Sequence, residues 1–315
     1  MKLGIIGYGN IAKKHLAAVA ELPDIQVTAI YDKVDIDNLS GIKTFEDLNA
    51  FLKEDLDIIS ICTPNGFHLD HSLAALSRAA VICEKPLALT HVDCQKIIDS
   101  ARETSKNVFC TMQNRYSPVS QWLKKITQEK SLGELYLVNV SCYWNRNKNY
   151  YAGSDWRGKS ALDGGTLFTQ FSHYVDTLYW LFGDMKILNA NFSNFDHDEM
   201  IEFEDTGIFN FTLDSGGMGT FSYTTSCYEK NFESSLTLIG SQGTVKVAGQ
   251  YMDRVEYCNI NGVEPPTLTA NDNLANIREV YLNAIAHING IKSNACSAED
   301  GMAVVKIIEE VYSYR

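Results

Sequence analysis

A glycine-rich segment near the start of the chain constrains the fold more than any other feature. Gly7, Gly9 and Ala12 form a GxGxxA pattern that follows an apolar stretch at 3–6 and opens a helical pattern at 11–21. The first glycine allows a tight turn, the second lets a diphosphate approach the backbone, and the alanine lets helix and strand pack closely. A plain glycine turn without a ligand is the alternative. Because a helix N-terminus favours an anion, we predict a dinucleotide site comprising Gly7, Gly9, Asn10 and Ile11.

Short apolar stretches alternate with helical patterns over about the first 115 residues. The stretches are rich in β-branched residues and apolar on both faces, as buried parallel strands are; they lie at 3–6, 27–30, 58–62, 80–83 and 108–112. Helical patterns separate them. This alternation predicts an α/β fold whose first domain, residues 1–117, is a Rossmann domain with a doubly wound parallel sheet.

The pattern changes in the second part of the chain, residues 118–315. Strand-like stretches between 187 and 260 are separated by glycine-containing turns, which is typical of hairpins. We therefore predict an α+β domain with a large, mostly antiparallel open sheet, which would bind substrate and form the oligomer interface. The chain ends in two helical stripes at 273–313, which could pack back on the first domain.

Composition limits the function classes. The net charge is −12, from 27 basic and 39 acidic residues, which disfavours nucleic-acid binding because that binding depends on phosphate neutralisation. No apolar run reaches the roughly 18 residues of a membrane-spanning helix. The eight cysteines contain no CxxC pair, so we expect no metal site and, without a secretion signal, a cytoplasmic protein with free thiols.

Asp32 ends the second predicted strand, 25 residues after Gly7. A carboxylate near this spacing binds the ribose hydroxyls of adenosine. Its charge would repel a 2′-phosphate, so the sequence favours NAD over NADP as cofactor. Two alternatives remain: the neighbouring Lys33 weakens this preference, and Asp32 could merely cap the strand end.

Glu84, Lys85 and Pro86 follow the predicted strand 80–83. The carboxyl ends of strands in a doubly wound sheet are where ligands bind. Burial and a cationic nicotinamide would both lower the pKa of Lys85, which would let its amine exchange protons near neutral pH. Taken alone, a surface lysine is the commoner explanation.

The combined motifs resemble the glucose–fructose oxidoreductase/inositol dehydrogenase/MocA (Gfo/Idh/MocA) oxidoreductase family. The resemblance rests on GxGxxA, Thr63-Pro64-Asn65 with His68, Glu84-Lys85-Pro86, and a Gly-Gly-x-Leu helix with His173 and Asp176. It implies an NAD-dependent oxidoreductase acting on CH–OH groups, a cis peptide before Pro86, and a homodimer or homotetramer.

The resemblance also implies roles for the matching residues. Lys85 would position or protonate the reacting hydroxyl, and His173 would be the base that takes or returns its proton. The residues along the nicotinamide side would be Thr63, Asn65, His68 and Glu84. The position four before the histidine, often Asp in this family, is here Thr169, which carries no charge, so Lys85 and His173 would transfer the proton alone.

Residues 143–156 contain five aromatic side chains, far above the chain average of 11%. Basic residues accompany them, namely Arg146, Lys148, Arg157 and Lys159. Aromatic faces suit sugar and base rings, and arginines bind carboxylates and diphosphates at two points; a subunit interface would suit the aromatics equally. We predict a substrate site formed by Asn114, Arg115, Tyr150, Tyr151, Trp156, Arg157, Thr169 and Gln170.

The stretch from Tyr150 to Gly165, with Gln113-Asn114-Arg115-Tyr116, is similar to a narrower branch, the bacterial UDP-N-acetylglucosamine(uronate) 3-dehydrogenases. That similarity implies oxidation of a ring hydroxyl, at C3, of a nucleotide-linked sugar in surface-polysaccharide or lipid A precursor synthesis. The alternatives are a dehydrogenase of a free polyol or sugar such as inositol, and a non-catalytic NAD- or sugar-sensing protein on the same fold.

Overall fold

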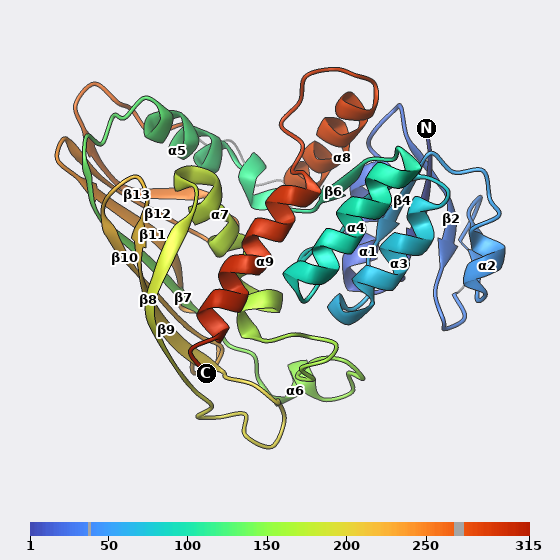
Figure 1. Ribbon diagram of the computed structural model, residues 1–315, viewed down its shortest axis with the longest axis horizontal. Helices are drawn as coiled ribbons and strands as arrows, with labels where there is room; N and C mark the ends of the chain where they lie inside the picture. Colours follow the sequence, from blue (N-terminus) through green and yellow to red (C-terminus); the bar gives the residue numbers. More distant parts are fainter. Residues whose placement is uncertain (37–38, 268–273) are drawn as a thin grey trace. The chain divides into compact units, whose positions relative to one another are not determined.

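The computed structural model describes residues 1–36, 39–267 and 274–315 and divides into two compact units (Figure 1). Unit 1 comprises Met1–Gln113 and Asp272–Val305, and unit 2 comprises Asn114–Asn271 and Lys306–Arg315. The last helix, α9 (Ala298–Tyr312), contributes residues to both units. No helix of the described residues is long and apolar enough to cross a membrane.

Unit 1 is built on a six-stranded parallel sheet with the order β3-β2-β1-β4-β5-β6. Its strands are β1 (Lys2–Ile6), β2 (Gln26–Tyr31), β3 (Lys43–Phe45), β4 (Ile58–Ile61), β5 (Ala80–Cys83) and β6 (Val108–Cys110). Every residue of β4 and β5 is buried, as expected for central strands covered on both faces. The strand order reverses between β1 and β4, which is where ligands bind in such sheets.

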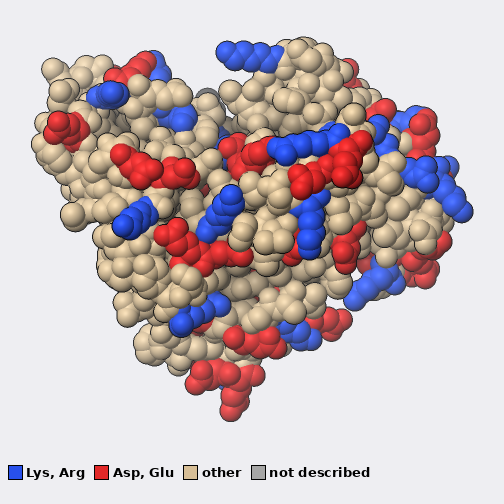
Figure 2. Space-filling view, viewed as in Figure 1, with Lys and Arg blue, Asp and Glu red and all other residues tan. Residues whose placement is uncertain are grey.

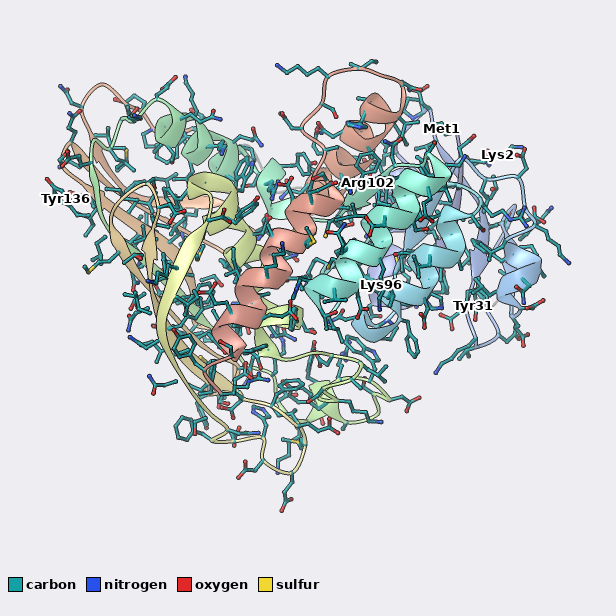
Figure 3. All side chains as sticks on the ribbon, viewed as in Figure 1. Met1, Lys2, Tyr31, Lys96, Arg102 and Tyr136 are labelled. Carbon is teal, nitrogen blue, oxygen red and sulfur yellow. The ribbon has the colours of Figure 1, made fainter. Side chains whose placement is uncertain are left out.

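Helices connect and cover these strands. They are α1 (Asn10–Val19), α2 (Leu48–Phe51), α3 (His68–Leu76), α4 (His91–Thr104) and α8 (Ala275–Ile288). Thr90 caps the N-terminus of α4, because its hydroxyl accepts a hydrogen bond from Asp93 N. The polar face of α4 carries Lys96 and Arg102, whose side chains are labelled in Figure 3. Between β2 and β4 the chain first adds the edge strand β3, and α2 then begins after Asp47.

Unit 2 contains a seven-stranded sheet with the order β13-β12-β11-β7-β10-β9-β8. Its strands are β7 (Leu135–Tyr143), β8 (Met185–Ser193), β9 (Thr206–Leu213), β10 (Met218–Thr224), β11 (Glu233–Gly240), β12 (Gly243–Ala248) and β13 (Arg254–Ile260). Only the β7–β10 pair is parallel among these described strands. With the parallel sheet of unit 1, this mostly antiparallel sheet confirms the predicted fold class.

The two faces of the unit 2 sheet differ. One face is buried and apolar, with residues such as Val140, Phe209 and Phe221, and α5 (Pro118–Gln128) and α7 (Ser172–Phe182) lie along it (Figure 1). Alternate residues on the other face, which we call the open face, are exposed although they are apolar. They include Tyr136, Leu188, Ile208 and Met218. Tyr136 is labelled at the outer side of the sheet in Figure 3.

Candidate functional site

The turn between β1 and α1 has the form that a dinucleotide requires. Gly7 has φ +91°, and a Cβ there would lie 2.8 Å from Thr63 Cγ2. Gly9 is the N-cap of α1, where no side chain caps the helix, and a Cβ there would meet nothing within 4 Å. That open space lies where a diphosphate would approach the N–H groups of Asn10 and Ile11. The residues of the turn therefore fit the cofactor.

Asp32 follows β2 and connects the strand end to this turn. One carboxylate oxygen accepts a hydrogen bond from Tyr8 N at 2.6 Å, and the other accepts one from Val34 N at 3.1 Å. The side chain is partly exposed. Because an ionised carboxylate offers about four acceptor sites, Asp32 retains capacity for ribose hydroxyls.

The segment after β4 carries three residues that the motif pattern assigned to the nicotinamide side. Thr63 Oγ1 lies 3.0 Å from His71 Nδ1, and the buried Asn65 begins a short 3₁₀ turn (Asn65–Phe67). His68 is fully buried: its Nδ1 lies 2.6 Å from the Pro86 carbonyl oxygen and its Nε2 lies 2.9 Å from that of Thr63. Burial lowers the pKa of His68, against the raising effect of these two contacts. His68 therefore ties the loop after β4 to the loop after β5.

Glu84, Lys85 and Pro86 form the loop after β5. The Lys85–Pro86 peptide is cis, as the family resemblance implied. Glu84 is 6% exposed; its Oε1 lies 2.8 Å from Nε2 of the buried His15, and its Oε2 accepts a hydrogen bond from Lys85 N at 3.2 Å. Lys85 itself is partly exposed. The carboxylate is thus held inside unit 1, while the lysine between it and Pro86 remains accessible.

The predicted base of unit 2 lies at the start of α7. His173 follows a π-helical turn (Leu167–Phe171), a distortion that often occurs at functional sites. Within this turn, the Thr169 hydroxyl donates to the carboxylate of Asp163 and also contacts its carbonyl oxygen at 3.0 Å. Asp163 is 2% exposed and accepts a hydrogen bond from Gly158 N at 2.8 Å. A carboxylate therefore lies beside position 169, which the sequence analysis did not foresee.

A cationic and aromatic group of side chains forms the second feature of unit 2. The guanidinium carbon of Arg146 lies 5.1 Å from the Tyr150 ring centre, and that of Arg157 lies 4.3 Å from the same centre. Arg146 Nε donates to Gln170 Oε1 at 2.8 Å, and Gln170 Nε2 donates to the Tyr150 hydroxyl at 2.8 Å. Trp156 is 5.5 Å from the Arg157 guanidinium carbon. We call Arg146, Tyr150, Arg157 and Gln170 the arginine–tyrosine cluster.

The charge of this cluster is not balanced by a carboxylate. Within the described ranges, neither Arg146 nor Arg157 forms an ion pair, and the buried Nε of Arg157 has no hydrogen-bond partner. Burial lowers the pKa of Arg146, and the positive charge of Arg157 acts in the same direction. Since uncompensated charge away from water is costly, an anionic ligand group would stabilise the cluster.

Three other predicted substrate residues are buried in contacts of unit 2. Arg115 is 5% exposed and bonds Asp176 through Nε at 2.9 Å and Nη2 at 2.6 Å. Asn114 is 1% exposed, and its Nδ2 lies 3.5 Å from the carbonyl oxygen of Gln250. Tyr151 packs in an apolar cluster with Ile201 and Phe203.

One buried histidine–carboxylate pair of unit 2 was missed. His197 Nδ1 lies 3.0 Å from Asp205 Oδ2, and His197 Nε2 lies 2.6 Å from the carbonyl oxygen of Arg146. Burial by itself would lower the pKa of His197, but the hydrogen bond and charge of Asp205 raise it overall. No motif marks this pair, which supports the backbone of the arginine–tyrosine cluster.

Two family descriptions match the chain. The oxidoreductase family with an NAD-binding Rossmann fold matches residues 1–112, and the GFO/IDH/MocA C-terminal domain matches residues 120–246. Together with the glycine turn and Asp32, these matches define a member of an oxidoreductase family with an NAD-binding Rossmann fold. The chain belongs to the Gfo/Idh/MocA family.

Curated relatives and solved structures place the chain among proteins of this family. It is 26% identical to D-glucoside 3-dehydrogenase of Escherichia coli and 27% identical to glucose-6-phosphate 3-dehydrogenase of Bacillus subtilis, over 62% and 58% of this chain. The matches span 58% and 53% of those relatives' lengths, a little over half. The WlbA dehydrogenase of Bordetella pertussis, solved with NADH and UDP-GlcNAcA, has a TM-score of 0.91 at 28% identity and covers 100% of this chain and 95% of its own. A levoglucosan dehydrogenase solved with NADH has a TM-score of 0.87 at 18% identity, over 100% of this chain and 96% of its own, which indicates the shared fold.

Proposed function

We propose that this chain is an NAD-dependent sugar dehydrogenase that oxidises a ring hydroxyl, at C3, of a nucleotide-linked sugar such as UDP-N-acetylglucosaminuronate or UDP-N-acetylglucosamine. The observation that carries the proposal is the arginine–tyrosine cluster, in which Arg146 and Arg157 flank Tyr150 without a carboxylate partner. Guanidinium groups suit carboxylates and diphosphates, and an aromatic face suits a sugar or base ring. The ligands of the similar WlbA dehydrogenase support this substrate class. Surface-polysaccharide or lipid A precursor synthesis would use the product.

The acidic surface of the protein makes such a cluster necessary. The net charge is −12, and Figure 2 shows acidic and basic side chains interspersed over the visible face. Long-range electrostatics therefore disfavour an anionic substrate. Two guanidinium groups without a carboxylate partner would supply the local attraction that overcomes this repulsion.

The cofactor would be held by unit 1. Gly7 and Gly9 leave room for its diphosphate at the N-terminus of α1, and Asp32 would bind the adenosine ribose. The residues along the nicotinamide would be Thr63, Asn65, His68 and Glu84. NAD, when bound, accepts a hydride from the carbon that carries the reacting hydroxyl.

Two titratable side chains would manage the hydroxyl proton. Lys85 would position or protonate the hydroxyl oxygen, and His173 would take or return its proton as a general base. Thr169 brings no charge, but its hydroxyl is oriented by the buried carboxylate of Asp163.

A panel of sugars with NAD tests the proposal. Purified protein is incubated with UDP-N-acetylglucosaminuronate, UDP-N-acetylglucosamine, inositol and glucose, while absorbance at 340 nm and product mass are followed. We expect a steady rise in absorbance and a mass loss of two hydrogens with a nucleotide sugar. Oxidation of inositol alone would favour a polyol dehydrogenase, and NAD binding without any oxidation would favour a sensing protein.

We also propose that the open face of the unit 2 sheet is buried in a homodimer or homotetramer. Its exposed apolar residues, such as Tyr136 and Met218, lie on strands whose other face is already covered by helices. An apolar sheet face of this kind is normally paired or covered. Light scattering at micromolar concentration should give a multiple of 35.2 kDa, and a monomer would contradict the proposal.

A further inference from the structure

A buried hydrogen-bonded chain reaches Glu84 from three other elements of unit 1. His15 of α1 is 1% exposed; its Nε2 lies 2.8 Å from Glu84 Oε1, and its Nδ1 lies 2.7 Å from the hydroxyl of Tyr281 in α8. That hydroxyl lies 2.8 Å from Ser60 Oγ in β4. Ser60 and Tyr281 are fully buried.

The Glu84 end of this chain fixes one proton position. An ionised Glu84 can only accept, so His15 Nε2 donates to it, whether His15 Nδ1 accepts from the Tyr281 hydroxyl or donates to its oxygen. Burial raises the pKa of Tyr281 well above its ordinary value, which keeps its hydroxyl proton available. The Tyr281 hydroxyl and Ser60 Oγ can exchange the roles of donor and acceptor. In each arrangement the proton on His15 Nε2 holds the Glu84 carboxylate.

A second buried histidine contacts the other side of the same loop. Nδ1 of His68, in α3, lies 2.6 Å from the Pro86 carbonyl oxygen. Nε2 faces another carbonyl oxygen, that of Thr63, at 2.9 Å, and a neutral ring can donate to only one of the two. The contact with Pro86 is the shorter, so we place the proton on Nδ1. Lys85 therefore lies between two residues that are held in place. His15 of α1 holds the side chain of Glu84, and His68 of α3 holds the carbonyl of Pro86.

We propose that His15 and His68 are positioning residues for Lys85, His15 through the carboxylate of Glu84 and His68 through the carbonyl of Pro86. This inference rests on the proposed role of Lys85 in proton transfer. Glu84 also accepts the backbone N–H of Lys85 at 3.2 Å, so movement of its carboxylate would move the lysine. Displacement of a reacting group by about 1 Å can cost about 10²-fold in rate.

Amide substitutions separate this role from mere filling of the core. At position 15, the amide of Gln reaches the place of Nε2, toward Glu84, whereas the shorter amide of Asn reaches only the place of Nδ1, toward Tyr281. We expect His15→Asn to lower kcat by about 10- to 100-fold and His15→Gln to stay within about threefold of the wild type. The affinity for NAD, measured by calorimetry, should change little in either variant.

At position 68 we expect the opposite order of the Asn and Gln variants. There the amide of Asn takes the place of Nδ1, toward Pro86, and the amide of Gln takes the place of Nε2, toward Thr63. His68→Gln should therefore lower kcat more than His68→Asn does. A general loss of packing would not reverse the order between two positions. Each position also remains informative if a variant at the other fails to fold.

Hydrogen exchange of the protein without NAD provides a readout that needs no turnover. We expect amides of residues 84–88 to exchange faster in His15→Asn and His68→Gln than in the wild type or in the opposite substitutions. Amides of residues 94–101, in α4, serve as the internal control. Equal exchange and equal kcat for Asn and Gln at both positions would overturn the proposal.

The same measurements separate this inference from the proposed function. If no sugar is oxidised by the wild type, the proposed function fails, while exchange at 84–88 still decides whether the histidines hold the loop. If Lys85→Met abolishes turnover and all four histidine variants keep it, the role of Lys85 stands and the positioning role is wrong.

Discussion

The two units present their ligand-binding groups in different ways. Unit 1 offers backbone N–H groups at the N-terminus of α1, made accessible because Gly7 and Gly9 carry no side chain. Unit 2 offers the charged side chains of Arg146 and Arg157, held by stacking on Tyr150 and by hydrogen bonds. A site made of backbone dipoles follows from local sequence. A site made of guanidinium groups depends on distant partners and is screened by salt.

The largest expected effects come from the two proposed proton-transfer residues, one in each unit. Lys85→Met and His173→Asn should each lower kcat by about 10²–10⁴-fold, the usual contribution of general acid–base groups. Affinity for NAD, measured by calorimetry, should remain nearly intact because the glycine turn and Asp32 are untouched. A near-wild-type rate in either variant would remove that residue from the mechanism.

Arg157→Ala should weaken substrate binding without affecting the cofactor. A hydrogen bond to a charged group contributes roughly 1.5–3 kcal/mol, so KM for a UDP-sugar should rise about 10- to 100-fold while the Kd of NAD stays constant. Lys159→Ala is the matched control, since Lys159 is basic, exposed and two residues away. Raising the salt concentration should weaken substrate binding by the wild type and have less effect on the variant. An unchanged KM in Arg157→Ala would contradict the proposal that unit 2 binds its ligand through charged side chains.

Asp32 is the charged group of the proposed cofactor site in unit 1. NAD should bind more tightly than NADP, because the carboxylate repels a 2′-phosphate. Asp32→Asn should reduce this preference by about tenfold, the effect of one charged hydrogen bond. Calorimetric titration with each cofactor gives the two dissociation constants, and their ratio measures this preference. Lys33→Ala is the neighbouring control. Tighter binding of NADP by the wild type would indicate that Lys33, and not Asp32, selects the cofactor.

Local conformation explains what the sequence could predict. The positive φ of Gly7, the cap at Thr90 and the alternation of strands and helices depend on residues a few positions apart. The pairing of buried side chains, in contrast, joins residues that are far apart in the sequence. His15 meets Glu84 across 69 positions, and Arg115 meets Asp176 across 61 positions. A basic residue in a motif cannot be distinguished by its sequence from one half of a buried ion pair, so Arg115 was predicted only as a substrate ligand.

Short-range pairs can also escape prediction when no motif marks them. Asp163 and Thr169 are six positions apart, yet their contact depends on the π-helical turn at Leu167–Phe171. This turn leads directly into the regular helix α7 (Ser172–Phe182). The extra residue in the turn changes which side chains share a face, and no periodicity in the sequence reports it.

The smallest effect concerns the histidine that supports the arginine–tyrosine cluster. Asp205 raises the pKa of His197, so the pair's contribution to the free energy of unfolding is fully present below about pH 6.5 and is lost as the pH rises through the raised value. Burial opposes ionisation of Asp205, but hydrogen bonds from His197, Asp196 N and Thr206 lower its pKa overall. That contribution is present above the ordinary pKa of Asp, about 4, and is lost as the pH falls.

The pair should therefore stabilise unit 2 most between about pH 4 and pH 6.5. All four tryptophans, Trp122, Trp144, Trp156 and Trp180, belong to unit 2, so their fluorescence reports the unfolding of that unit. We expect His197→Gln, whose amide can still reach the Arg146 carbonyl, to be less stable than the wild type at pH 5. The difference should shrink at pH 8, above the ordinary pKa of histidine, because His197 then loses its proton. The exposed His287→Gln in unit 1 should show no such change. A difference independent of pH would mean that His197 supports the cluster by shape alone.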